Sequence, residues 1–365
     1  MNILDKVLKG KRLSAEDGER LFKSSDIISI GRAAHEILKR KHPDGVVTYI
    51  VDRNINYTNI CFSKCLFCAF YRERDSDDAY ILTKEELSRK IDETITLGGR
   101  QILLQGGLNP DLGIEFYESL LRFIKSTARS HGCPEIHIHG FSPPEIVHIS
   151  KKSGLSIEDA IRRLKDAGLG SIPGGGAEIL VDTVRERISP NKCTDREWLD
   201  VMKTAHTIGL KTTATMMYGH IESYRDRIDH LIKIRELQDN TGGFTAFIPW
   251  SFQSKNHPPS PPFLKRGIKG GSGIDYLKTL SISRLMLDNF DNIQASWVTQ
   301  GHKVAQLALF FGANDMGSTM IEENVVRAAG VSFRISEAEI RRLIEDAGFR
   351  AMRRDTFYQP SSNPP

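Results

Sequence analysis

Residues 46–68 read VVTYIVDRNINYTNICFSKCLFC, and the expected architecture follows from this stretch. Its first six residues, Val46 to Val51, are rich in β-branched side chains, which predicts a β-strand. Three cysteines, Cys61, Cys65 and Cys68, follow shortly after it. In barrels of parallel strands, reactive side chains lie on the loops at the carboxyl ends of the strands. The stretch therefore predicts a first strand that leads into a candidate active-site loop.

Beyond this loop, short β-type runs alternate with longer helical stretches, which is typical of repeated βα units on a parallel sheet. No second class of composition divides the chain. We therefore expect an α/β fold, a near-complete TIM-type (β/α) barrel, with a doubly wound open sheet as the alternative. The further strands are expected at residues 101–104, 135–139, 211–217, 244–250 and 293–298.

Sequence signals for helix starts help to divide the chain into three segments. S/T-x-x-E capping boxes mark helix starts at Thr83, Ser142, Thr194 and Ser336. Expected helices at 14–24 and 27–41 make residues 1–45 an N-terminal helical segment. Residues 46–330 are expected to form the barrel, with a Pro/Gly-rich insertion at 256–273, and residues 331–365 a C-terminal extension with a capped helix and a short strand.

Composition excludes several classes of protein. The 365 residues carry 50 Lys and Arg against 46 Asp and Glu, and this even balance gives no reason to expect nucleic acid or a membrane surface as partner. No apolar run reaches the length of a membrane span, and the first residues are too polar for a signal peptide, so a cytoplasmic location is expected. Five cysteines in a chain of this size indicate reduced thiols and argue against a disulfide framework.

The spacing of the cysteine loop, C-x3-C-x2-C, allows three thiolates to surround one iron–sulfur cluster. A [4Fe–4S] cluster takes four ligands, so three cysteines leave one iron open, and an open position is typical of catalytic metal sites. The alternatives are a zinc site completed by a histidine such as His139, or buried thiols without a metal. Cys133 and Cys193 lie outside the motif and are expected to be inert.

Several segments together resemble a known family. The cysteine loop, Phe67 before its last cysteine, and the pair Gly106-Gly107 after the second expected strand resemble the radical S-adenosylmethionine (SAM) enzymes. Over nearly the whole chain the sequence is similar to the futalosine-pathway group of menaquinone biosynthesis, and most similar there to the enzymes that cyclise dehypoxanthine futalosine. This similarity is carried by residues 52–59, 104–110, 139–145, 171–178, 247–253 and 311–315.

The resemblance implies a radical SAM barrel, a [4Fe–4S] cluster on Cys61, Cys65 and Cys68, and SAM as cosubstrate. It implies that a 5′-deoxyadenosyl radical abstracts the C4′ hydrogen from the ribose of dehypoxanthine futalosine, and that the resulting carbon radical adds to the benzoate ring. It also implies an external electron donor such as flavodoxin or ferredoxin, with no nucleic acid or membrane among the partners.

Residues near the loop and at strand ends are the candidates for binding SAM. The resemblance places Phe67 and Phe70 near the adenine, and Gln105, Gly106 and Gly107 near the methionine group, where glycine permits close backbone approach. The alternatives are ordinary barrel core for the aromatic residues and a simple turn for the glycines.

The reaction on the aromatic ring needs a base, and His139, Glu178 and His220 each fall at the end of an expected strand. A hydrogen-bonded structural role is the alternative for each of them. The substrate carboxylate needs a cation, and Arg53 is a candidate, with a salt bridge on the outside of the barrel as its alternative.

Three functions remain open from the sequence. The first is the cyclase. The second is a sister radical SAM enzyme, either aminofutalosine synthase or the radical SAM half of the deazaflavin FO synthase, because these share the cysteine loop and the glycine segments. The third is a non-catalytic iron–sulfur or zinc protein that uses the loop for stability or electron transfer.

Overall fold

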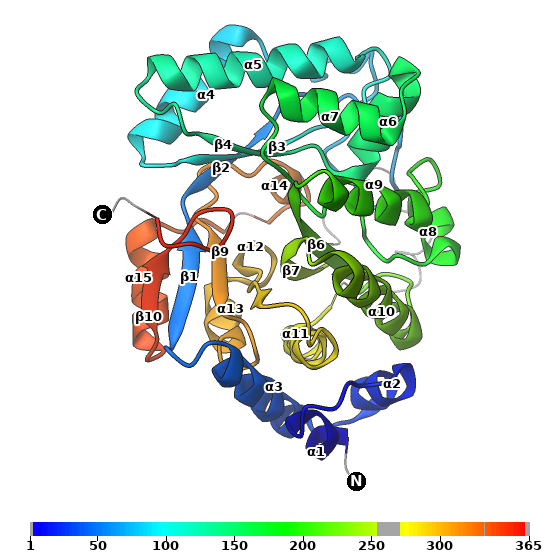
Figure 1. The fold of residues 1–365 in the computed structure, drawn as a ribbon, viewed down its shortest axis with the longest axis vertical. Coiled ribbons are helices and arrows are strands. Elements are labelled where there is room, and N and C mark those ends of the chain that lie inside the picture. The colour runs from blue at the N-terminus through cyan, green and yellow to red at the C-terminus, as the bar shows by residue number, and fades with distance from the viewer. Residues whose placement is uncertain (1–2, 254–270, 332, 362–365) are drawn as a thin grey trace.

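Parallel strands at the centre of the molecule are surrounded by helices in the computed structural model, which describes residues 3–253, 271–331 and 333–361 (Figure 1). One sheet has three strands in the order β10-β1-β9, and a second sheet has seven strands in sequential order from β2 to β8. All registered pairs in both sheets are parallel. The strands are β1 (Val46–Ile50), β2 (Asp52–Asn56), β3 (Gln101–Gln105), β4 (His137–Gly140), β5 (Ser171–Ile172), β6 (Lys211–Tyr218), β7 (Phe244–Ser251), β8 (Asn292–Ile293), β9 (Asp315–Ser318) and β10 (Arg350–Arg353).

Backbone hydrogen bonds join the two sheets into one barrel. On one side, the N–H of Ile321, which follows β9, donates to the carbonyl oxygen of Asp52 on β2 at 3.1 Å. On the other side, the N–H of Ala295, just after β8, donates to the carbonyl oxygen of Asp315 at 2.8 Å. The expected α/β barrel is therefore confirmed, and β10 adds a strand to the outer edge of β1.

Helices cover the outside of this barrel, and α2 and α3 confirm the two helices expected before the first strand. A short helix before them, α1, was not predicted. The helices are α1 (Ile3–Leu8), α2 (Ala15–Lys23), α3 (Ile27–Lys41), α4 (Lys84–Thr96), α5 (Ile114–Ser130), α6 (Pro143–Ser153), α7 (Ile157–Ala167), α8 (Asp182–Ile188), α9 (Asp195–Thr207), α10 (Tyr224–Thr241), α11 (Gly273–Met286), α12 (Trp297–Gln300), α13 (His302–Ala308), α14 (Val325–Ala328) and α15 (Glu337–Asp346).

The predicted capping boxes are confirmed at Thr83, Ser142 and Thr194, where both reciprocal hydrogen bonds form. At Ser336 only one half of the box is present, because the Ser336 hydroxyl accepts from the backbone of Glu339 while the Glu339 carboxylate lies 3.3 Å from His302. A contact with a residue distant in the sequence has taken the side chain that the local motif would use.

Two of the expected strands differ from the structure. The first continues past Val51 as β2, because the chain changes partners there: β1 pairs with β9 and β10, and β2 pairs with β3. The strand expected at 293–298 ends at Ile293, and a helix begins at Trp297. The buried Trp297 indole donates to the carbonyl oxygen of Ser318 at 2.9 Å, a contact between distant segments that overrides the local β pattern.

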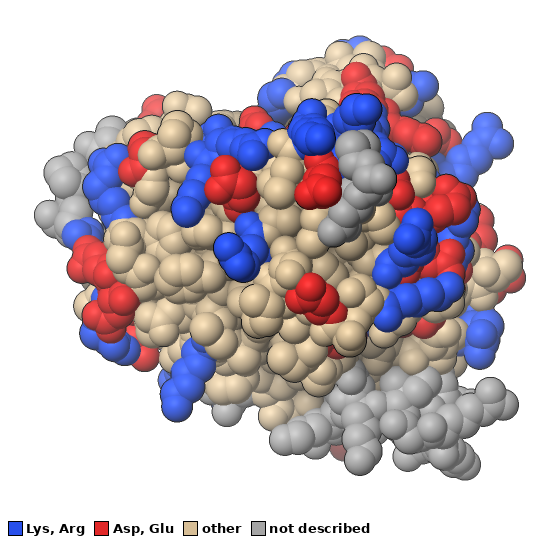
Figure 2. Space-filling model, turned by 90° about the horizontal axis from the view of Figure 1, so that it is seen from below, with Lys and Arg blue, Asp and Glu red and all other residues tan. Residues whose placement is uncertain are grey.

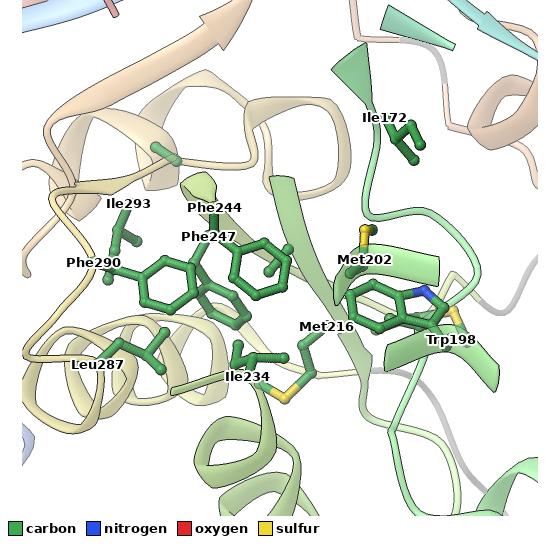
Figure 3. Packing of buried hydrophobic residues seen from close by; sticks show 14 of the residues in the cluster. Ile172, Trp198, Met202, Met216, Ile234, Phe244, Phe247, Leu287, Phe290 and Ile293 are labelled. Atoms are coloured by element: carbon green, nitrogen blue, oxygen red, sulfur yellow. The ribbon is translucent and has the colours of Figure 1, made fainter. Parts of the chain in front are cut away.

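Aromatic and aliphatic side chains fill the space between the strands and the outer helices (Figure 3). Phe244 on β7 stacks on Phe290 at a centroid distance of 5.5 Å, and the Phe247 ring meets Phe290 edge-on at 6.4 Å. Trp198 of α9 stacks on the other side of Phe244 at 6.4 Å. These contacts pack the amino-terminal half of β7 against its neighbours.

Lys and Arg side chains are interspersed with Asp and Glu on the face that Figure 2 shows, in keeping with the even charge balance of the sequence. Among the described residues, no helix has the length and apolarity that a bilayer crossing requires. Residues 254–270, which include most of the expected insertion, lie outside the described part of the chain. Gly273, the last residue of that insertion, begins α11, whose N-terminus is capped by Ser272.

Candidate functional site

The cysteine loop, residues 61–68, lies at the carboxyl end of the first barrel strand and is fastened to two neighbouring segments. The N–H of Phe62 donates to the carbonyl oxygen of Leu108 at 3.1 Å. The N–H of Leu66 donates to the carbonyl oxygen of Ile188, at the end of α8, at 2.9 Å. The loop is thus held between the segments that follow β3 and β5.

The three thiols of this loop are close enough to influence one another. Burial raises the pKa of Cys61 and raises the pKa of Cys68 to about 12, and the neighbouring Cys65 raises both further. Three thiolates packed together need a positive charge between them, and iron–sulfur clusters are held by thiolates in this way. The donor set therefore fits a cluster.

A site for a single metal ion has less support. Within the described ranges, no three His, Cys, Asp or Glu side chains are placed to hold one ion. His139, the expected fourth ligand of a zinc site, forms its hydrogen bond at 2.6 Å with Ser171. The structure therefore does not bring His139 into a zinc site with the cysteines.

The pair Gly106-Gly107 packs directly against the cysteine loop. A Cβ atom built on Gly107 would lie 2.2 Å from the carbonyl oxygen of Ile60, and one on Gly106 would lie 2.6 Å from the Tyr57 ring. The N–H of Gly107 donates to the carbonyl oxygen of Thr58 at 2.9 Å. Gly107 needs to be glycine because the backbone of the cysteine loop lies against it, and Gly106 because the Tyr57 ring packs on it.

A buried ion pair lies beside the cysteines. Lys192 Nζ donates to Glu178 Oε1 at 2.5 Å and lies 5.1 Å from the centre of the Phe67 ring. Burial opposes the charge on Lys192, but Cys65 and Glu178 outweigh it and raise the Lys192 pKa. In the same way, burial of Glu178 is outweighed by Lys192 and Arg185, which lower the Glu178 pKa. Glu178 is thus a carboxylate that pairs with Lys192, the residue next to the cysteine loop.

A cavity of about 290 Å³ lies inside the barrel. Its wall is formed by inward-facing residues of several strands, among them Asn54, Leu103, Gln105, Thr215 and Trp250. Such a cavity at the carboxyl ends of barrel strands is where this architecture binds its ligands.

The three candidate bases lie in different places. His139 lines the cavity, and burial lowers its pKa to about 3, so its ring is neutral at physiological pH. Glu178 and His220 do not appear among the described residues that line it. The N–H of Ile221 donates to His220 Nδ1 at 2.8 Å, and His220 Nε2 lies 3.0 Å from the Met217 carbonyl oxygen, so both ring nitrogens have partners. The structure brings only His139 to the cavity.

The candidate SAM-binding residues also lie in two different places. Gln105 lines the cavity. Phe67 packs on the core beneath Lys192, and Phe70 is partly exposed beside the cysteine loop. Phe67, Phe70, Gly106 and Gly107 therefore lie in or next to the cysteine loop, whereas Gln105 lines the cavity inside the barrel.

Arg53 faces away from the cavity. Its guanidinium lies 2.8 Å from Glu93 on α4 and 3.7 Å from Glu322, because neighbouring residues of a strand point to opposite sides. The salt bridge, which was the alternative expectation for Arg53, is what the structure shows.

A polar floor closes the lower end of the cavity. Arg354 forms two hydrogen bonds to Asp315, at 2.5 Å and 3.0 Å, and the Asp52 carboxylate accepts from Gln101 at 2.6 Å. Burial raises the pKa of Asp52. The sequence offered no sign of this floor, because its residues come from distant parts of the chain and share no motif.

Lys192, beside the cysteines, was also missed. It follows α8 in a segment, Ser189 to Lys192, that carries no recognised motif. Lys192 stands out only in the folded structure, where it bonds to Glu178 and interacts with Cys65 of the cysteine loop.

Two family profiles match the sequence. The profile of the radical SAM superfamily matches residues 55–234, and the profile described as the CofH/MqnC C-terminal region matches residues 241–365. The first match contains the cysteine loop and Gly106-Gly107. The second contains the polar-floor residues Asp315 and Arg354.

Curated relatives cover almost the whole chain. The cyclic dehypoxanthine futalosine synthase of Halalkalibacterium halodurans is 45% identical over 98% of this chain and 94% of its own. The enzyme of the same name from Streptomyces coelicolor is 40% identical over 98% of this chain and 88% of its own. The 5-amino-6-(D-ribitylamino)uracil–L-tyrosine 4-hydroxyphenyl transferase of Archaeoglobus fulgidus is 44% identical over 88% of this chain and 90% of its own.

Solved structures share the fold at low identity. Methylornithine synthase has a TM-score of 0.72 at 19% identity and covers 96% of this chain and 97% of its own. The FeFe-hydrogenase maturase HydG from Carboxydothermus hydrogenoformans has a TM-score of 0.73 at 17% identity, covering 98% of this chain and 80% of its own. At this identity the likeness concerns the fold alone.

Proposed function

Because the chain belongs to the radical SAM superfamily, we propose that it cyclises dehypoxanthine futalosine in menaquinone biosynthesis. The observation that carries the proposal is the 45% identity over 98% of the chain to a cyclic dehypoxanthine futalosine synthase. The similarity includes both the segment with the cysteine loop and the C-terminal region. We infer that the two share a substrate as well as a fold.

In this proposal Cys61, Cys65 and Cys68 hold a [4Fe–4S] cluster. A cluster held there would supply the reducing electron for the cleavage of SAM to a 5′-deoxyadenosyl radical. The pair Gly106-Gly107, directly after β3, lets the cysteine loop pack against the end of the barrel, and Lys192 offsets the negative charge of the thiolates. An external donor such as flavodoxin or ferredoxin delivers the electron.

The cavity supplies the other half of the reaction. Its volume of about 290 Å³ suits one small molecule, and cyclisation joins two parts of the same molecule. Holding the ribose C4′ and the benzoate ring in contact turns the bond-forming step into an intramolecular reaction, which favours it strongly. Trp250 and Trp297 line this space and exclude water from the carbon radical. His139 is the proposed base, since it is the candidate base that reaches the cavity.

A second candidate has its own support. The transferase of Archaeoglobus fulgidus is nearly as similar, at 44% identity, and its name specifies 5-amino-6-(D-ribitylamino)uracil and L-tyrosine. An enzyme of that kind joins two molecules, whereas the cyclase closes a ring within one molecule and removes two hydrogens from it. The substrates therefore distinguish the two functions directly.

The test is anaerobic reconstitution with iron and sulfide, then reduction with SAM and either dehypoxanthine futalosine or the two transferase substrates. The proposal predicts 5′-deoxyadenosine and a product two hydrogens lighter than dehypoxanthine futalosine, both seen by mass spectrometry. Product only from the transferase pair would replace the proposal with the second candidate.

Two variants provide the control. Cys68→Ser removes one thiol of the loop and is expected to abolish SAM cleavage. Cys133→Ser changes a buried cysteine outside the loop and should leave SAM cleavage near the wild-type rate. Cleavage of SAM by a loaded Cys68→Ser protein would contradict the assignment of the cluster ligands.

A further inference from the structure

Two histidines on β4 are connected through one serine hydroxyl on β5. His139 Nδ1 lies 2.6 Å from Ser171 Oγ, and His137 Nε2 lies 2.7 Å from the same oxygen. Alternate residues of a strand face the same side, which places both rings on the inner side of β4. Ser171 is the register partner of His139, so its hydroxyl falls between them.

The two rings border different cavities. His139 lines the cavity inside the barrel, and His137 lines a second cavity of about 560 Å³. The wall between the two cavities is shared and is formed by Ile50, Gln101, Arg354 and Thr356. The second cavity lies at the amino-terminal end of the strands and includes the carboxylates of Glu135 and Asp355. The hydrogen-bonded chain therefore crosses the polar floor from one cavity to the other.

The surroundings hold His137 in this position. A Cβ atom on Gly170 would lie 2.5 Å from the His137 ring, so glycine leaves room for the imidazole. The ring of Phe357, from the C-terminal extension, meets the His137 ring edge-on at 5.2 Å. The ring is therefore confined between β5 and the C-terminal extension.

Both imidazoles are neutral at physiological pH. Burial lowers the pKa of His139 to about 3 and the pKa of His137 to about 4. A neutral imidazole carries one N–H and one lone pair, which is what a member of a proton relay needs. Ser171 has one hydroxyl hydrogen and can accept from one ring while it donates to the other.

We propose that His139, Ser171 and His137 form a proton relay that carries the proton released from the substrate's aromatic ring out to the second cavity. The inference rests on the proposed function. The C–H bond at the attacked ring carbon breaks and its proton binds to His139 Nε2. His139 Nδ1–H then passes its proton to Ser171, and the Ser171 hydroxyl passes its own to His137 Nε2.

The remaining proton leaves His137 Nδ1 for the water and carboxylates of the second cavity. The electron pair of the broken C–H bond restores the aromatic ring, and the one surplus electron goes to an acceptor of the iron–sulfur cluster class. The relay moves only the proton. His139 is the residue in contact with the substrate, and Ser171 and His137 act through it.

The first experiment removes the hydroxyl. Ser171→Ala breaks the chain and keeps both imidazoles, and Ser171→Thr restores a hydroxyl. Ser281→Ala is the matched control, because Ser281 is buried and its hydroxyl donates to a carbonyl oxygen at 3.0 Å far from the relay. Single-turnover reactions compare 5′-deoxyadenosine with cyclised product.

For Ser171→Ala we expect 5′-deoxyadenosine within about twofold of wild type but a ratio of product to 5′-deoxyadenosine about 10²-fold lower, as for loss of a proton-transfer group. Ser171→Thr should recover most of this ratio, and Ser281→Ala should leave it unchanged. An unchanged ratio in folded Ser171→Ala would refute the relay.

A second experiment does not depend on that variant. His137→Ala opens space in the second cavity, which has room for added imidazole. We expect the ratio to fall as in Ser171→Ala and to rise at least tenfold with imidazole, a rescue that a structural role would not produce. If imidazole does not raise this ratio in folded His137→Ala protein, the relay is refuted. The proposed function would still be supported in that case if the wild-type protein forms the cyclised product. Wild-type protein that cleaves SAM without cyclised product would refute the proposed function and the relay together.

Discussion

Gly107→Ala tests how the end of β3 holds the cysteine loop. The added Cβ would lie 2.2 Å from the carbonyl oxygen of Ile60 and 3.0 Å from Cys61 Cβ. An ordinary contact begins at 3.4 Å, so the two backbones must separate by about 1.2 Å, the difference between 3.4 Å and 2.2 Å. Neither side yields easily, because the Gly107 N–H is bonded to the Thr58 carbonyl oxygen and the Phe62 N–H to that of Leu108.

Overpacking of this kind costs about 1–3 kcal/mol of unfolding free energy. The assay is urea denaturation of the apoprotein followed by circular dichroism, with iron content per chain measured after reconstitution. Iron content should fall as well, because the displaced atoms belong to the cysteine loop. Gly273→Ala is the control, since its Cβ would meet only Val304 at an ordinary 3.6 Å. An unfolding free energy within about 0.5 kcal/mol of wild type, together with full iron content, would refute the reasoning.

Three further predictions follow from buried polar groups. Asp315→Ala leaves the buried Arg354 guanidinium without its carboxylate and should cost about 3–5 kcal/mol of unfolding free energy in urea titrations; a loss below about 1 kcal/mol would contradict the buried pair. Tyr57→Phe removes the hydroxyl that donates to Glu145 at 2.7 Å and should cost about 1–3 kcal/mol, with Phe116→Leu as a less buried aromatic control. His206 has its pKa lowered to about 4 by burial, so the unfolded chain binds protons that the folded chain does not, and stability falls as pH drops below about 6.5. This histidine should account for a loss of about 2 kcal/mol of unfolding free energy by pH 5. His206→Gln should therefore flatten the dependence of the unfolding free energy on pH. An unchanged slope would show that His206 is protonated in the folded state.

Local chemistry made parts of the fold predictable. Thr83, Ser142 and Thr194 could be identified as helix caps because a capping box involves residues only three positions apart. Helix α3 begins and ends where it was expected, at residues 27 and 41. The strand expected at 293–298 was wrong beyond Ile293, because the Trp297 indole finds its partner at Ser318, on another strand.

In the candidate site, too, some residues could be predicted from local sequence and others could not. The cysteine loop and Gly106-Gly107 are contiguous motifs, and the sequence alone was sufficient to single them out. Lys192 carried no such signal, because Glu178 and Cys65 reach it only through the packing of separate loops. Among the three candidate bases the sequence offered no means of choosing, since all three follow expected strands. The structure places His139 on β4, where its side chain lines the cavity.

By itself, the sequence determined the α/β repeat, the three-cysteine loop and the family, because each depends on residues that are neighbours in the chain. The tertiary structure decided which side chains share a space: the Asp315–Arg354 pair, and the two histidines joined by Ser171. The physical reason is that a hydrogen bond or ion pair needs contact within a few ångströms. Between residues as distant in sequence as 139 and 171, or 315 and 354, only the pairing of strands in the folded sheets provides that contact.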